Sequence, residues 1–255
     1  MKKSFKANEL LYLSMLCGAY EVFSLPDVFH GKTEDEIKSY VDATSKACAD
    51  KKFYTADFEG KRKLNASIDK AIHIIAAADT ITELIIRNTK ARQQRYLLYY
   101  KGKDKTILFE SGGDYFICDE QELDKLTVSL RVLFAEGCLL KAETLSFAIS
   151  QDEIEEARAG KKPKATAMRA LMRDKGVDET TALLITEGIA GRAGYFSAAT
   201  VNRRDNSVKT AYFLADSGMA LQISTDEKGN MTFAAITNEA AMQTALSFVG
   251  GDFYV

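Results

Sequence analysis

The chain has 255 residues, 46% hydrophobic and 27% charged, and so carries enough apolar side chains to bury a substantial core. Its 34 basic and 36 acidic residues are mixed along the sequence, which offers no basic face to a nucleic-acid backbone, and we expect no nucleic-acid partner. No apolar run approaches the ~20 residues that a membrane span needs, so no membrane insertion is expected.

The N-terminal stretch could be mistaken for a signal peptide, because two lysines precede an apolar run in MKKSFKANELLYLSMLCGAY. Lys6 and Glu9 interrupt this pattern early, and no small-x-small cleavage site follows it. We interpret Asn8 to Leu16 as the first helix of the fold. The sequence therefore predicts a cytoplasmic protein.

Two further helices are predicted from capping and from the spacing of apolar residues. The segment Thr33 to Ala49 begins with a capping box, in which the Thr33 hydroxyl and the Glu36 carboxylate each accept the other residue's backbone N–H. Apolar residues then recur at helical spacing, and the same pattern returns in Ser67 to Ala78. A short polar segment joins the two predicted helices.

Four strands are predicted from Ile81 onward, where the apolar period changes to two. They are ITELIIRN, RQQRYLLYY, KTILFE and DYFICD, separated by NTKA, KGKDK and SGGD. Parallel neighbours need a crossover of about a dozen residues or more, so strands joined this tightly form an antiparallel meander. A helix from Glu120 to Phe134 follows.

The second half of the chain repeats this plan. Its predicted helices are Asp152 to Arg158, Ala165 to Asp174 and Glu179 to Gly188, its strands are Tyr195 to Arg203, Val208 to Ala215, Ala220 to Ser224 and Met231 to Ile236, and its last helix begins at Asn238. Tyr96 to Phe134 and Ala211 to Val249 align at an offset of roughly 115 residues, as after an ancient internal duplication. The sequence predicts an α+β fold of two pseudo-twofold-related units, each with helices, a four-stranded antiparallel meander and a final helix.

The two predicted halves are residues 1–149 and 150–255. Between them, SQDEIEEARAGKKPKAT places an acidic block before a basic block that contains glycine and proline. A solvated helix with its exit loop is favoured over a binding tail. We expect the chain to cross between the halves near Pro163, and the halves to form one compact unit.

Two glycine-bearing loops, KGKDK and SGGD, raise the question of phosphate binding. A phosphate cradle needs a glycine-rich loop that leads into a helix N-terminus. Both loops join strands instead, and SGGD corresponds to DEKGN in the second half, so both are interpreted as hairpin turns. GKT, at Gly31 to Thr33, has Pro26 where a P-loop needs glycine, and GIAGRAG, at Gly188 to Gly194, is interpreted as a helix C-terminus and connector.

No catalytic, metal or cofactor site is predicted. The chain has two histidines, His30 and His73, without a GxSxG, HExxH or cysteine–histidine signature, and His73 is interpreted as a helix-face residue. The cysteines have apolar neighbours and no CxxC pair, and are interpreted as reduced thiols: Cys17, Cys48, Cys118 and Cys138. The sequence therefore favours a protein that is not an enzyme.

The first meander is the predicted partner-binding surface. Both of its faces carry apolar bulk, of which most packs in the core and a surplus remains for a partner. The predicted aromatic anchors are Tyr96, Tyr99 and Tyr100, beside a basic rim of Lys101, Lys103 and Lys105. Such a rim would steer an acidic helix.

Several segments together resemble the EspG-like chaperones of type VII (WXG-type) secretion systems. They are the opening helix NELLYLSML, the SLPD turn, the helix TEDEIKSYVDATSKACA, and the paired meander-plus-helix units that end at LTVSLRVLF and MQTALSFV. The resemblance implies a cytosolic chaperone or adaptor that binds a helical-hairpin export substrate of the WXG or LXG type. Two alternatives stay open: a toxin-neutralising immunity protein, and a small-ligand-binding protein or enzyme that uses the groove between the halves.

Overall fold

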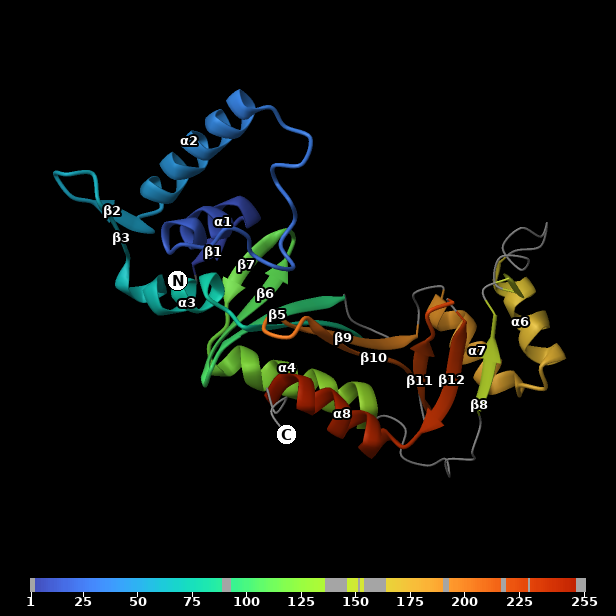
Figure 1. The fold of residues 1–255 in the computed structure, drawn as a ribbon. Coiled ribbons are helices and arrows are strands. Elements are labelled where there is room, and N and C mark those ends of the chain that lie inside the picture. The colour runs from blue at the N-terminus through green and yellow to red at the C-terminus, as the bar shows by residue number, and fades with distance from the viewer. Residues whose placement is uncertain are drawn as a thin grey trace. The chain divides into compact units, whose positions relative to one another are not determined.

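Figure 1 shows the computed structural model, in which the chain divides into two compact units by its internal contacts. It describes residues 3–88, 93–135, 146–150, 152–153, 164–189, 193–216, 219–228 and 230–250. Unit 1 comprises Met1–Glu83, Arg95–Asp119 and Thr200–Val208, and unit 2 comprises Leu84–Gln94, Glu120–Ala199 and Lys209–Val255. Each unit thus contains residues from both sides of position 150. The predicted crossing at Pro163 lies outside the described residues.

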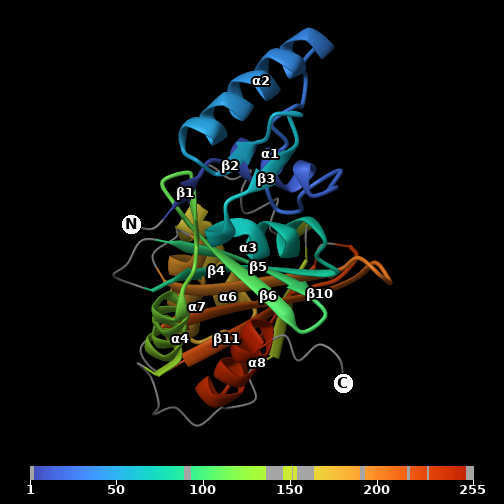
Figure 2. The ribbon, with the colours of Figure 1, turned by 90° about the vertical axis from the view of Figure 1, so that its left-hand side faces the viewer.

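Three helices of unit 1 agree with the sequence prediction. They are α1 (Ala7–Leu16), α2 (Glu34–Asp50) and α3 (Ala66–Ala76), and α1 lies between the other two (Figure 1 and Figure 2). The predicted capping box begins α2: the Glu36 carboxylate accepts the Thr33 N–H at 2.8 Å, and the Thr33 hydroxyl accepts the Glu36 N–H at 3.4 Å.

The first predicted meander is confirmed in unit 1. Its strands are β4 (Thr80–Arg87, whose last residues belong to unit 2), β5 (Gln94–Lys101), β6 (Asp104–Ser111) and β7 (Asp114–Ile117). They follow the order β7-β6-β5-β4, with antiparallel pairing of β5 to β6 and of β6 to β7. A two-residue strand β1 (Ser4–Phe5) extends this order beyond β7, with Phe5 opposite Tyr115.

Both glycine-bearing loops of this meander are hairpin turns, as predicted. Gly112 and Gly113 join β6 to β7 with φ angles of 62° and 81°. Two consecutive residues in the left-handed region are what a type I′ turn requires. In KGKDK, Gly102 has a φ of 58° and lies between the paired residues Lys101 and Asp104.

The core of unit 1 lies between its helices and one face of the meander. Leu97 and Tyr99 of β5 and Leu108 of β6 pack in a single apolar cluster with Leu13 of α1 and Ile72 of α3. Successive residues of a strand point to opposite faces, so the alternate residues of β5 lie on the other side of the strand.

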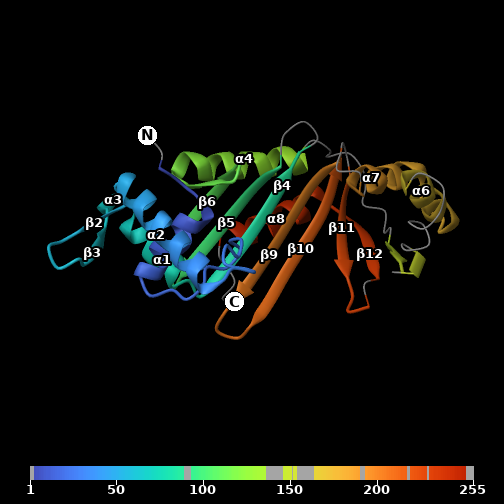
Figure 3. The ribbon, with the colours of Figure 1, turned by 90° about the horizontal axis from the view of Figure 1, so that it is seen from above.

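Unit 2 repeats the order of a four-stranded meander followed by a helix. Its elements are α4 (Glu120–Ala135), β8 (Ser146–Ile149), α6 (Lys164–Asp174), α7 (Glu179–Ile189), β9 (Gly194–Asn202, whose last residues belong to unit 1), β10 (Ser207–Asp216, whose first residues belong to unit 1), β11 (Met219–Thr225), β12 (Met231–Ile236) and α8 (Asn238–Gly250). The strand order is β9-β10-β11-β12-β8 (Figure 3). The predicted α+β class is therefore confirmed.

Helices cover both faces of the unit 2 strands. Phe213 of β10 packs against Phe134 of α4, with ring centroids 5.8 Å apart, and against Phe196 of β9. The next residue, Leu214, belongs instead to the cluster that contains Ile185 of α7 and Met172 of α6. Adjacent residues of a strand point to opposite faces, so α4 and α7 lie on opposite sides of β10. On its own side, α4 packs beside α8.

Three short features were missed by the sequence prediction. They are β1, the hairpin of β2 (Tyr54–Ala56) and β3 (Arg62–Leu64), and β8, which pairs with β12. Strands of two to four residues are too short to show a period of two. Most of the predicted helix Asp152 to Arg158, and Cys138, lie outside the described residues. Within the described part of the chain, no helix combines the length and the apolar character of a membrane span.

Candidate partner-binding site

The three tyrosines predicted as partner anchors are buried. Tyr96, Tyr99 and Tyr100 are 2%, 0% and 7% exposed. Tyr99 belongs to the core cluster of unit 1, and the Tyr96 ring packs against Phe109 of β6, with centroids 5.2 Å apart. Their rings stabilise the fold, and a partner could reach them only after a rearrangement of the sheet. The three lysines of the prediction are exposed.

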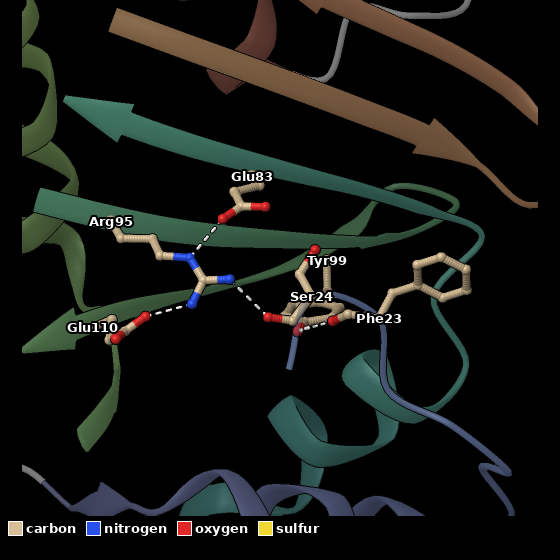
Figure 4. Close-up of polar contacts among 6 residues, drawn as sticks. All are labelled: Phe23, Ser24, Glu83, Arg95, Tyr99 and Glu110. Atoms are coloured by element: carbon tan, nitrogen blue, oxygen red, sulfur yellow. Dashed lines mark hydrogen bonds and ion pairs between the residues drawn. The ribbon is translucent and has the colours of Figure 1, made fainter. Parts of the chain in front are cut away.

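Arg95 of β5 lies at the centre of an ion-pair network across three strands (Figure 4). Its Nε donates to Glu83 of β4 at 2.6 Å, and its Nη1 donates to Glu110 of β6. Its Nη2 donates to the carbonyl oxygen of Ser24 at 2.8 Å. Burial alone would lower the pKa of Arg95, but the hydrogen bonds that it donates to Glu110 and Glu83 outweigh burial and raise the pKa. Arg95 therefore stays charged and joins the meander to the segment that contains Ser24.

That segment, residues 18–32 between α1 and α2, is here called the strap. Tyr99 adds a second hydrogen bond to it, because its hydroxyl donates to the carbonyl oxygen of Phe23 at 2.9 Å. Burial raises the pKa of Tyr99, so the hydroxyl keeps its proton at physiological pH. Arg95 and Tyr99 thus hold two consecutive carbonyl groups of the strap, where Ser24 has a left-handed φ of 62°.

Asp79 organises a second polar group, at the start of β4. Its carboxylate accepts from Arg204 at 2.7 Å and from Lys101 at 3.2 Å. Its backbone carbonyl oxygen accepts the N–H of Arg203 at 2.8 Å. Burial alone would raise the pKa of Asp79, but the hydrogen bonds from Arg204 and Lys101 outweigh it and hold the pKa below its ordinary value. Asp79 therefore links the β5–β6 turn to the β9–β10 turn.

Basic side chains outnumber acidic ones around these turns. We call the following group the basic edge: Lys70, Lys101, Lys103, Lys105, Arg203 and Arg204. The basic edge contacts the carboxylates of Asp79, Asp104 and Glu21, with Lys70 2.7 Å from Asp104. With Asp205 of the β9–β10 turn counted as well, six basic residues against four acidic ones leave a positive surface, which attracts an acidic partner.

Four exposed apolar side chains belong to the end of α1 and to the strap. The exposed fractions are 44% for Met15, 38% for Leu16, 100% for Tyr20 and 36% for Phe23. Arg203 connects this group to the basic edge: its guanidinium lies 5.4 Å from the centroid of the Phe23 ring and 3.4 Å from the Glu21 carboxylate. The apolar residues and the basic edge thus adjoin each other within unit 1.

Sequence reasoning did not single out the strap as a segment with exposed aromatic residues. Tyr20 and Phe23 belong to a stretch with neither helical nor strand periodicity, and such a stretch reads as a connection. Two aromatic residues in a connection, just before Pro26, are the signal that could have identified it. Arg203 has no such signal, because only the fold brings it to Phe23.

The remaining candidate groups have structural surroundings. His73 of α3 is exposed, 3.6 Å from Asp69, and its Nε2 is 3.9 Å from Cys17 Sγ. Burial raises the pKa of the Cys48 thiol to about 12, which keeps it unreactive. Among the described residues, no group of three or more His, Cys, Asp or Glu side chains could hold a metal ion.

A small pocket lies between α1 and α2. It is lined by Asn8, Tyr12, Met15, Phe29, Tyr40, Val41 and Thr44. None of these side chains carries a charge at neutral pH, so the pocket offers no acid–base pair. It is a packing gap beneath the strap.

No family model matches this sequence, and no curated protein sequence is similar to it. Among solved structures, the chain is similar to the type VII secretion system chaperone EspG5 of Mycobacterium tuberculosis, determined in complex with a PE25–PPE41 dimer. The TM-score is 0.55 at 12% sequence identity, and the alignment covers 97% of this chain and 96% of that chain. At this identity the likeness shows a shared, EspG-like fold.

Proposed function

We propose that the protein is a cytoplasmic chaperone or adaptor that binds a secreted helical protein of a type VII-like secretion system. The observation that carries the proposal is the fold similarity to EspG5, which extends over 97% of this chain rather than over one common motif. A shared fold alone does not assign a function, so the proposal also draws on the surface of unit 1.

The polar groups of unit 1 favour binding over catalysis. The carboxylates of Glu83 and Glu110 both accept from Arg95, and Asp79 accepts from two cations. A general acid or base needs a carboxylate whose pKa is raised toward neutrality, whereas the pKa of Asp79 is lowered. These groups hold the strap and the turns in place, which suits a surface built for recognition.

The proposed partner is a helical hairpin of the WXG or LXG type. The resemblance to EspG-like chaperones, which hold helical-hairpin export substrates, supports this class of partner. The predicted basic rim of Lys101, Lys103 and Lys105 belongs to the basic edge. We therefore place the proposed interface on unit 1, with the exposed lysines and not the buried tyrosines at its rim.

Affinity capture in the organism that encodes the protein tests this function. The tagged protein is expressed in its native cells, and captured proteins are identified by mass spectrometry. A captured candidate is then co-expressed with the protein and purified by size exclusion. We expect a stable complex with a secreted helical protein, which loses solubility when it is expressed alone.

Secretion gives the second readout. Deletion of the gene should reduce export of the captured protein, and the wild-type gene should restore it. Normal export in the deletion strain, or a captured partner that is neither helical nor secreted, would contradict the chaperone proposal. Capture of a single toxin whose activity is neutralised would favour the immunity-protein alternative.

A further inference from the structure

We propose that the partner is recognised by the strap and the basic edge together, and that the segment they recognise is an acidic amphipathic helix. Tyr20 and Phe23 would contact the apolar stripe of that helix, while Arg203, Arg204 and Lys103 would contact acidic residues beside the stripe. This inference rests on the proposed function, which it deepens by naming the surface and the chemistry of the partner segment.

The strap presents Tyr20 on a short segment that is fixed at both ends. On one side, Gly18, with a φ of 90°, ends α1, and the Ala19 N–H donates to the Ser14 carbonyl oxygen at 3.1 Å. On the other side, Tyr99 holds the carbonyl group of Phe23. Because only a few residues lie between these fixed points, little backbone conformational freedom is left to be lost on binding. Preorganisation of this kind lowers the entropic cost of association.

A fully exposed aromatic side chain on a fixed backbone segment suggests that a protein partner covers it. Tyr20 is 100% exposed, yet aromatic side chains are among the residues that contribute most to burial and to interface energy. Met15, Leu16 and Phe23 extend the exposed apolar surface on either side of Tyr20 in the sequence. Tyr20, the most exposed of these residues, therefore lies between exposed apolar residues along the chain.

The positive charge of the basic edge favours a partner helix with acidic residues beside its apolar stripe. Arg203 contacts both Phe23 and Glu21 of the strap, and Arg204 follows it in the same turn. Lys103 is exposed at the tip of the β5–β6 turn, which Asp79 links to the turn that contains Arg204. A surface with this excess of cations beside an apolar patch is complementary to carboxylates beside an apolar stripe.

The size of the patch fits a single helix. The exposed apolar residues lie within the nine positions from Met15 to Phe23. An amphipathic helix presents a stripe of about 100° of its circumference, with three to four apolar residues per two turns. A partner with a broad flat surface would need apolar contacts well beyond this segment.

A designed peptide tests this inference without knowledge of the natural partner. The probe is a labelled helix of about 18 residues, or five turns, with leucine and phenylalanine on one face and glutamate on both flanks of that face. A matched peptide replaces every glutamate by lysine. Fluorescence polarisation with the full-length protein at two salt concentrations gives the Kd for each. We expect the acidic peptide to bind at least about tenfold more tightly, with a preference that falls as salt rises.

Two pairs of variants locate the binding surface. Tyr20→Ala should raise the Kd of the acidic peptide by about tenfold or more, because it removes the central anchor. Its matched control is Phe58→Ala, which removes an aromatic residue that is 97% exposed between β2 and β3. Lys103→Glu should weaken binding severalfold at low salt, and Lys46→Glu, an equal charge change on the exposed surface of α2, should not.

Equal affinity for the acidic and basic peptides would overturn the proposed chemistry. An unchanged Kd for Tyr20→Ala, or an equal loss in Phe58→Ala, would overturn the proposed location. The captured natural partner separates this inference from the proposed function. If that partner binds the Tyr20→Ala variant as tightly as the wild type, the surface is wrong while the chaperone function stands. If no secreted partner exists but the peptide results hold, the function is wrong while the surface stands.

Discussion

The hydroxyl groups of Thr82 and Thr200 form a buried hydrogen bond at 2.8 Å, although 118 positions separate the two residues in the sequence. Thr82 belongs to β4 and Thr200 to β9, the first strands of the two meanders. Both side chains are buried, at 0% and 4% exposure. Each hydroxyl therefore depends on the other for a partner that water does not supply.

Valine substitutions at these positions should show strong coupling. Thr82→Val or Thr200→Val alone leaves one buried hydroxyl without its partner and should destabilise the protein by about 1–3 kcal/mol. The double variant removes both hydroxyls and should be closer to wild type than the sum of the single variants. Urea unfolding of all four proteins measures this. Strictly additive losses would show that the hydrogen bond contributes no coupling energy.

Asp79→Asn should change how stability depends on pH. The folded carboxyl has a pKa below its ordinary value of 3.8, so its stabilising contribution is present above that value and is lost as the pH falls through the folded pKa. The cations that it binds, Lys101 and Arg204, are 50% and 60% exposed, which limits the contribution to about 1 kcal/mol.

Thermal unfolding between pH 7 and pH 2 tests this prediction. Asp79→Asn should be less stable than wild type at pH 7, and the difference should shrink as the pH falls below 3.8. Asp226→Asn is a useful comparison, because Asp226 also has a lowered pKa but accepts its hydrogen bonds from Asn230 and Lys228 within its own turn. A constant difference between wild type and Asp79→Asn across this range would contradict the assigned role.

Gly194→Ala and Gly188→Ala should differ in cost. A Cβ on Gly194 would lie 2.5 Å from the Ala215 carbonyl oxygen and 2.7 Å from Leu133 Cδ1. The backbone at Ala215 cannot move away at low cost, so we expect Gly194→Ala to lower the free energy of unfolding by about 2–3 kcal/mol. A Cβ on Gly188 would meet the Leu214 side chain, which can rotate, and alanine also favours helix α7 by about 1 kcal/mol. Chemical unfolding should therefore rank Gly194→Ala as the less stable variant, and the reverse order would be inconsistent with this packing.

Lys103→Glu combined with Lys105→Glu should slow association with the cognate export substrate. Lys101 is left unchanged because it donates to Asp79, so its replacement would also affect the turn. The double variant should keep the wild-type Tm, since both side chains are exposed. Stopped-flow association at two salt concentrations measures the on-rate, which should fall most at low salt. An on-rate equal to wild type would move the interface away from the β5–β6 turn.

Local sequence patterns determine most of the fold. The change of period at Ile81 and the capping box at Thr33 both identify elements that the structure contains. Patterns of this kind report a residue's neighbours along the chain. They could not predict β8, because Ser146–Ile149 becomes a strand by pairing with β12, more than eighty positions later.

The candidate site was less predictable for a related reason. The alternation in β5 shows that Tyr99 and Tyr96 lie on opposite faces, but both faces are apolar, and nothing in β5 indicates that both will be covered. The strap that accepts the Tyr99 hydrogen bond lies 76 positions earlier. The lysines of the β5–β6 turn were identified correctly as exposed, because a hairpin turn lies on the surface in almost any fold.

The pairing of α4 with α8 places a constraint on the synthesis of the protein. Leu126, Leu130 and Phe134 of α4 are buried, and α4 packs beside α8, whose residues 238–250 leave the ribosome more than a hundred residues after it. At about 5–20 residues per second, this interval lasts several seconds, during which the apolar face of α4 is without α8. Unit 2 can complete its core only after that interval. A nascent chain that stalls before residue 238 would therefore display a helical apolar surface to the cell's folding machinery.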